Sequence, residues 1–229
     1  MATPVSERGT FGSGPLSRAS ALIYSLIVTE LLFLVTGTPG LVLLLLLERD
    51  ASNAPLAALC AAPLGPAASA TLYAVRHRRR DLADLHPARL FWRGYRANAA
   101  GALKVWLPWL AGLAIIAVNL AHFDAARVPG WWAVLMVIVA VGSVLWMSAA
   151  LVITSLFAFR ARDVARLAGW SLTRFPGLTL TSVCLVVLAG ALAVFVAEPL
   201  ALLPVPVFAM ALLYHARPMI AEIEERFIA

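Results

Sequence analysis

Long apolar segments, separated by short polar ones, make up most of the chain after residue 18. A helix needs about 20 mainly apolar residues to cross a hydrocarbon layer of about 30 Å. The segments lack the alternation of apolar and polar positions that a membrane β-barrel requires. The pattern therefore predicts an all-α, polytopic transmembrane helical bundle of about six spans. The expected spans lie near residues 20–47, 55–75, 102–121, 131–159, 178–197 and 199–214.

The predicted organisation is one transmembrane helical domain, residues 19–229, preceded by a flexible cytoplasmic tail. Residues 1–18 are rich in Gly, Ser, Thr and Pro, so they are not expected to bury a core. No cleavage site clearly follows the first apolar segment, which we interpret as an uncleaved span. Composition agrees, because 62% of the residues are hydrophobic and 13% are charged, whereas soluble domains carry about 25% charged residues.

The positions of the basic residues predict the topology. Lys and Arg accumulate on the cytoplasmic side of membrane proteins. With six spans and both termini cytoplasmic, every Lys and Arg lies inside except Arg49 and Arg127. The segment 55–75 is the weakest span because it contains several prolines, but without it the basic cluster from Arg76 to Lys104 would lie outside. The charge pattern therefore supports the second span.

The segment "LFWRGYRANAAGALKVWLPWL" (90–110) predicts a basic amphipathic helix that leads into the third span. One stripe of this helix carries Arg89, Arg93, Arg96 and Lys104. A second stripe carries Phe91, Trp92, Tyr95 and Trp106. The arginines are expected at anionic headgroups and the aromatics at the interface. A specific lipid or partner-protein site is the alternative, and nucleic acid is not an expected partner.

Glu30 is the acidic residue that lies deepest in a predicted span. A carboxylate there costs several kcal/mol, so it should face the bundle and find a partner or be protonated. Two interpretations stay open, a path for protons, cations or substrate and a structural carboxyl. Tyr24, Asn119 and Thr154 are the suggested partners.

Proline and glycine interrupt several spans, including "TGTPG" (36–40), "APLGPAA" (62–68) and "LLPVPV" (202–207). Broken helices build binding sites in transporters, yet Pro and Gly are also common in membrane helices. The segment 157–170 contains Arg160 and Asp163 and is expected to be a lipid-facing helix end, in which Asp163 can pair with Arg166. The chain contains none of the sequence motifs of a catalytic, metal or cofactor site that we sought, so we expect no enzyme and no cofactor.

Three segments carry a resemblance to a known family: "PLGPAASATLYAVR" (63–76), "FWRGYRANAAGALKVWLP" (91–108) and "FAFRARDVARLA" (157–168). They resemble the YesL-like family of small bacterial integral membrane proteins, whose function is unknown. The family's G-P-A feature matches a segment containing Pro66. Its F-x-x-x-[FY]-x-x-N feature matches Phe91, Tyr95 and Asn98. The chain departs from the family in its longer first loop.

The resemblance implies a multi-pass protein of the plasma membrane. Such proteins are often encoded beside carbohydrate uptake systems, which suggests an accessory or regulatory role in solute transport with transporter subunits as partners. Two alternatives remain at this stage. One is an autonomous small transporter that uses Glu30, and the other is a structural or assembly protein that binds lipids or partner helices.

Overall fold

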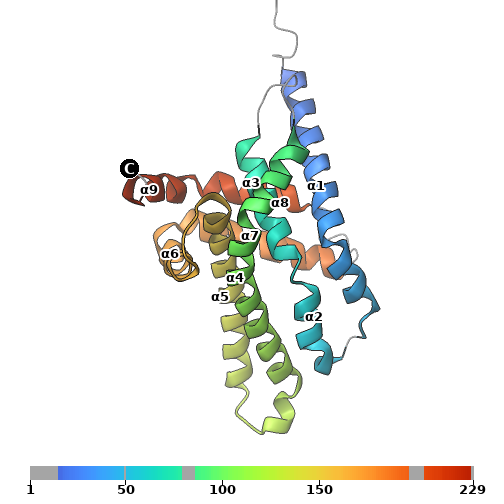
Figure 1. The fold of residues 1–229 in the computed structure, drawn as a ribbon. Coiled ribbons are helices and arrows are strands. Elements are labelled where there is room, and N and C mark those ends of the chain that lie inside the picture. The colour runs from blue at the N-terminus through green and yellow to red at the C-terminus, as the bar shows by residue number, and fades with distance from the viewer. Residues whose placement is uncertain (1–14, 49, 79–85, 196–203, 228–229) are drawn as a thin grey trace, which may run out of the picture.

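The computed structural model describes residues 15–48, 50–78, 86–195 and 204–227, which form helices and turns with no β-strand (Figure 1). The helices are α1 (Pro15–Leu46), α2 (Ala54–Cys60), α3 (Leu64–His77), α4 (Pro87–Ala121), α5 (Trp131–Leu156), α6 (Ala161–Arg174), α7 (Pro176–Phe195), α8 (Val205–His215) and α9 (Arg217–Phe227). Two short 3-10 turns, η1 (Ala51–Asn53) and η3 (Phe123–Ala126), lie in the loops. The prediction of an all-α helical protein is confirmed.

Three helices, α1, α4 and α5, are long and apolar enough to cross a membrane alone. Two further candidates are bent pairs, with 42° between the α2 and α3 segments and 97° between α6 and α7. By length and composition, the described residues therefore provide three to five candidate spans, whereas the sequence pattern predicts about six. Helix α8 has 11 residues, or about 16 Å of helix, which is too short to cross. The first part of the predicted sixth span, residues 199–203, lies outside the described residues.

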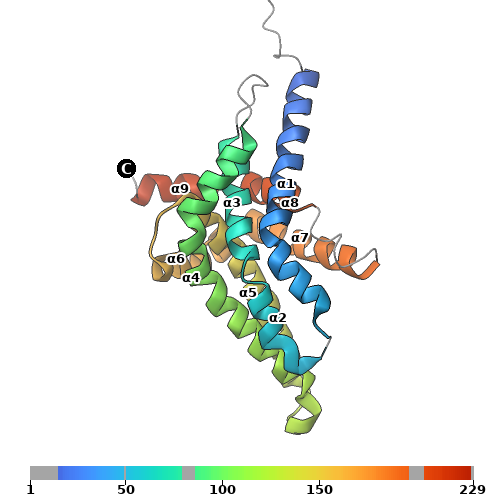
Figure 2. The ribbon, with the colours of Figure 1, turned by 45° about the vertical axis from the view of Figure 1, so that its right-hand side comes forward.

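The apolar helices do not all run in one direction. Helices α1, α4 and α5 follow the long dimension of the molecule, whereas α7, α8 and α9 run across it in both views (Figures 1 and 2). Helix α7 holds most of the predicted fifth span, so this segment does not lie parallel to α1, α4 and α5. The start of α1, the end of α3 and the start of α4 lie together at one end, opposite η3.

Two helix boundaries differ from the predictions. Helix α1 begins at Pro15, inside the expected tail, and residues 1–14 lie outside the described part of the chain. Helix α4 is continuous, so the basic entry segment and the third span are one helix that includes Pro108. Pro39 likewise lies inside α1. The "TGTPG" segment is therefore not a helix break.

A polar turn, residues 50–53, precedes α2. The Asp50 carboxylate accepts hydrogen bonds from the Ser52 hydroxyl at 2.6 Å and the Ser52 backbone N–H at 2.7 Å. These two donors lower the pKa of the Asp50 carboxyl from its ordinary value. The Asn53 amide donates to the Glu48 carbonyl at 3.1 Å, so this bond ties the segment after α1 to the start of α2.

Helix α3 lies at the centre of the packing, in contact with α1, α4, α5 and α8. Its small residues allow this, and Ala67 and Ala70 are both 0% exposed. A larger apolar cluster joins α5 to the C-terminal helices through side chains such as Met147, Leu178 and Met219. The core therefore sits where the transverse helices meet the long ones.

Candidate functional site

Two glycines bring α3 and α4 into close contact. A Cβ on Gly65 would overlap the Trp106 indole, and a Cβ on Gly94 would come within 2.7 Å of the Tyr73 side chain. The Trp106 Nε1–H donates to the Ala61 carbonyl at 3.0 Å, in the turn between α2 and α3. Each glycine thus provides the space for an aromatic ring from the facing helix, which fixes the register of the pair.

Pro66 lies in the first turn of α3 and is buried. The first backbone N–H groups of a helix have no partner within it, so the missing N–H of proline costs little there. The bend between the α2 and α3 segments precedes Pro66, at the turn that contains Pro63. Pro66 therefore helps to start the central helix and does not interrupt it.

Phe91 lies in the protein core, and Tyr95 packs at the edge of the same cluster. Phe91 is 0% exposed and packs with Phe33 and the alanines of α3. Tyr95 is partly buried against the same cluster, with its ring 6.2 Å from that of Phe91. In the predicted aromatic stripe, Trp92 alone is classed as exposed, at 40%. The expectation of an interfacial stripe is wrong for Phe91 because this face of α4 packs on α1 and α3.

Asn98 joins α4 to the end of α5. Its Nδ2–H donates to the Ser155 carbonyl at 2.9 Å, and this carbonyl is in the last turn of α5, where carbonyls lack partners within the helix. The Ser155 hydroxyl lies 3.0 Å from the Ser69 hydroxyl of α3. This polar junction of three helices, Asn98, Ser155 and Ser69, includes two serines that sequence reasoning missed, since serine in an apolar helix carries no distinctive signal.

Glu30 lies in α1 with both carboxylate oxygens buried and no hydrogen-bond partner in the described part of the chain. Of the three suggested partners, one is bonded elsewhere and one is exposed. The Asn119 amide donates to the Ile115 carbonyl of its own helix at 2.8 Å, and Tyr24 is 52% exposed. The buried Thr154 hydroxyl also has no partner within the described residues. None of the three suggested bonds forms.

The basic face of α4 is exposed as predicted. It consists of Arg89, Arg93, Arg96 and Lys104. Among the residues that the structure describes, none of these four makes an ion pair. The exposed Trp92 ring lies on the same helix, so cationic and aromatic groups are both available on the first half of α4.

Arg160 and Asp163 are also exposed, at the start of α6, and do not join the polar junction. The suggested ion pair between Asp163 and Arg166 does not form. The ion pairs found among the described residues join Glu222 to Arg174 and to Arg226. These residues are therefore a polar helix start, as the sequence pattern allowed.

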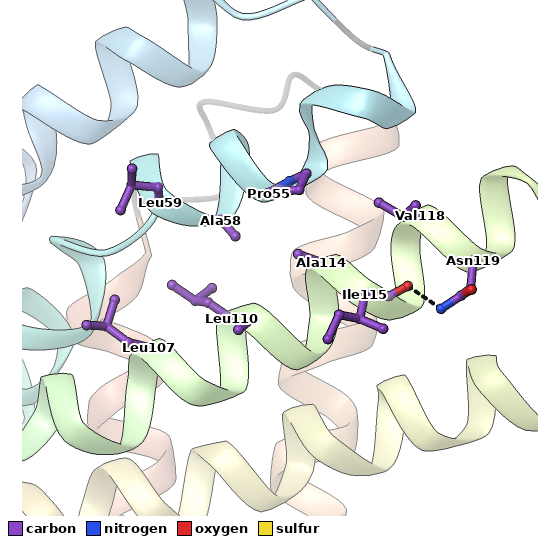
Figure 3. A pocket seen from close by; sticks show the side chains of 10 residues that line it. Pro55, Ala58, Leu59, Leu107, Leu110, Ala114, Ile115, Val118 and Asn119 are labelled. Carbon is purple, nitrogen blue, oxygen red and sulfur yellow. Dashed lines mark hydrogen bonds between the residues drawn. The ribbon is translucent and has the colours of Figure 1, made fainter.

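An apolar groove of about 460 Å³ lies between α2 and α4 (Figure 3). Leu59 of α2 and Leu107 and Leu110 of α4 line one part of it, and Asn119 lies at the far end. No group of three or more His, Cys, Asp and Glu within the described ranges is placed to hold a metal ion. The groove offers apolar contact and a single amide that is already bonded.

The family model described as "Protein of unknown function, DUF624" matches residues 26–120, from α1 through almost all of α4. The match includes Glu30 and the α3–α4 pair, and ends before Ser155, Arg160 and Asp163. No curated protein and no solved structure matches the chain. The similarity is thus to a family of unknown function, and it covers the segment that carries most of the motif residues.

Proposed function

We propose that this chain is a multi-pass protein of the bacterial plasma membrane that binds a partner protein and catalyses no reaction. Its role would be that of an accessory or regulatory component of solute uptake, with carbohydrate as the first solute class to test. The observation that carries this proposal is the basic face of α4, which is exposed and makes no ion pair within the described residues.

The rigidity of α4 supports a docking role. Its opposite side packs on α3 through Gly94 and is tied to α5 by Asn98, so the basic face is held in place before a partner arrives. A preformed surface loses less conformational entropy on binding, and Arg and Trp are enriched among the residues that dominate binding energy. An acidic cytoplasmic surface of a transporter subunit is the partner that this chemistry favours.

The transport part of the proposal rests on the YesL-like resemblance, in which such proteins are often encoded beside carbohydrate uptake systems. This is an association between genes. The basic face of α4 is the surface through which we propose that the chain contacts a transporter subunit. By the positive-inside rule, the basic face is expected on the cytoplasmic side.

The test replaces Arg89, Arg93 and Arg96 together by Glu and measures which proteins co-purify from the native membrane in mild detergent. We expect loss of a transporter subunit, because three attractive charges become repulsive. The matched control replaces Arg160, Arg162 and Arg166 by Glu, which changes the net charge equally at the start of α6, and should keep the partner. If both variants still recover the transporter subunit, the basic face of α4 is not needed for docking. If both variants lose it, the effect is not specific to α4. Either result would contradict docking through α4.

A second candidate function is an autonomous transporter, favoured by the buried Glu30 carboxylate that has no hydrogen-bond partner in the described chain. Intramembrane carboxyls commonly lie on proton or ion paths. In this case Glu30→Gln should abolish solute-driven proton flux into liposomes, whereas Glu48→Gln, at an exposed position after α1, should not. Unchanged flux in Glu30→Gln would remove Glu30 from such a mechanism.

A further inference from the structure

A second cavity, of about 430 Å³, lies between the C-terminal end of α3 and helix α8. Arg76, Arg78 and Arg217 line it together with the Tyr214 ring. Val75 and Leu213, which are 8% and 6% exposed, contribute apolar surface. The cavity therefore combines a cationic part with an apolar part.

The arginines come from separate helices, so the fold places like charges around one space. Arg76 is in α3 and Arg217 begins α9, and both are exposed. The Arg217 guanidinium carbon lies 4.6 Å from the centre of the Tyr214 ring, which holds it over the aromatic face. Like charges that are brought together repel one another, and a bound anion would offset this cost.

No acidic residue in the described part of the chain lines the cavity. On α9, Glu222 is directed to other cations, with its carboxylate 2.8 Å from Arg226 and 3.9 Å from Arg174. Among the described residues, Arg76 and Arg217 therefore have no acidic neighbour in this cavity, and a bound anion would complement them.

We infer that this cavity binds an anionic phospholipid, with the headgroup phosphate at Arg76 and Arg217 and an acyl chain along the apolar wall. Guanidinium groups form strong, often bidentate, bonds to phosphate. The end of α3 lies at the predicted cytoplasmic side, and basic pockets between helices on that side bind anionic headgroups. Free phosphate shares the anionic chemistry but would leave the apolar wall unused. The inference is independent of a partner protein on α4.

The experiment uses the purified full-length protein in a neutral detergent and native mass spectrometry to measure bound lipid. The probes are phosphatidylglycerol, phosphatidylcholine and inorganic phosphate. We expect a clear preference for phosphatidylglycerol, and about tenfold weaker binding in the Arg76→Gln/Arg217→Gln double variant. The matched control, Arg162→Gln/Arg166→Gln, removes the same charge from exposed positions of α6 and should bind within about twofold of the unchanged protein.

Three results would overturn the inference. Equal weakening in both double variants would mean a diffuse attraction to the net positive charge of the protein. Equal retention of phosphatidylcholine would mean that the phosphate charge is not recognised. Displacement of the lipid by millimolar inorganic phosphate would assign the cavity to free phosphate. Both arginines are exposed, so the double variant should melt at the usual temperature, and if it does not, the two single variants make the same comparison.

Discussion

Asn98 and Glu30 are two polar residues in apolar surroundings, and they differ in whether their side chains have a hydrogen-bond partner. The Asn98 amide donates to a carbonyl at the end of α5, a group that the helix itself cannot satisfy. The Glu30 carboxylate has no hydrogen-bond partner among the described residues. A satisfied polar group stabilises the fold, whereas an unsatisfied one is costly and is retained where function needs it. At this scale the Asn98 hydrogen bond is a contact that stabilises the packing, and Glu30 is the residue whose function most needs a test.

The hydrogen bond of Asn98 predicts a loss of stability in Asn98→Ala. We expect the free energy of unfolding to fall by about 1 kcal/mol, since the Ser155 carbonyl would lose its donor. Asn119→Ala is the control, because that amide is exposed and bonds within its own helix. Unfolding of the purified variants in detergent, followed by circular dichroism, provides the comparison. Equal losses in both variants would show that the junction of α3, α4 and α5 contributes nothing specific.

The element that organises the packing is the α3–α4 pair. Its contact depends on two glycines that each face an aromatic side chain of the other helix, and on the small residues of α3 that let α1, α5 and α8 approach. In a membrane such close packing is a main source of helix association, because lipid gives apolar side chains little reason to prefer protein. The pair is therefore more sensitive to added volume than to lost charge.

Added volume at Gly94 should weaken this pair. A methyl group there would come within 2.7 Å of Tyr73, so Gly94→Ala should destabilise the protein by roughly 1–3 kcal/mol. Gly112→Ala in the same helix meets nothing within 4 Å and should be neutral or stabilising by up to about 1 kcal/mol. Melting temperatures of the two variants, measured in the same detergent, compare their stabilities. A melting temperature for Gly94→Ala at or above that of Gly112→Ala would contradict the close contact between Gly94 and Tyr73.

The sequence predicted the apolar helices and the exposure of the basic stripe, because hydropathy and charge are properties of single segments. It did not predict that Phe91 is buried. A helical periodicity identifies a stripe, but in a membrane an apolar stripe faces lipid or protein equally well. The link from Asn98 to Ser155 spans 57 positions, and the direction of α7 depends on its 97° bend from α6. Both are set by tertiary packing, which no local pattern contains.

At the scale of the whole molecule, the ends of the long helices differ in charge. The end of α3 and the start of α4 lie together at one end of the molecule and carry Arg76 and the basic face of α4, while η3 lies at the other end (Figures 1 and 2). Both the proposed partner site and the inferred lipid cavity lie toward the basic end. Their common requirement is that this end faces the cytoplasm.

Cysteine labelling in spheroplasts tests this requirement most directly. The background replaces the two free cysteines, Cys60 and Cys184, by alanine, and single cysteines are placed at Arg93 in α4 and at Ala125 in η3, both exposed. We predict that a membrane-impermeant maleimide labels Ala125→Cys in sealed spheroplasts and labels Arg93→Cys only after permeabilisation. Labelling of Arg93→Cys in sealed spheroplasts would contradict the cytoplasmic placement of the basic end.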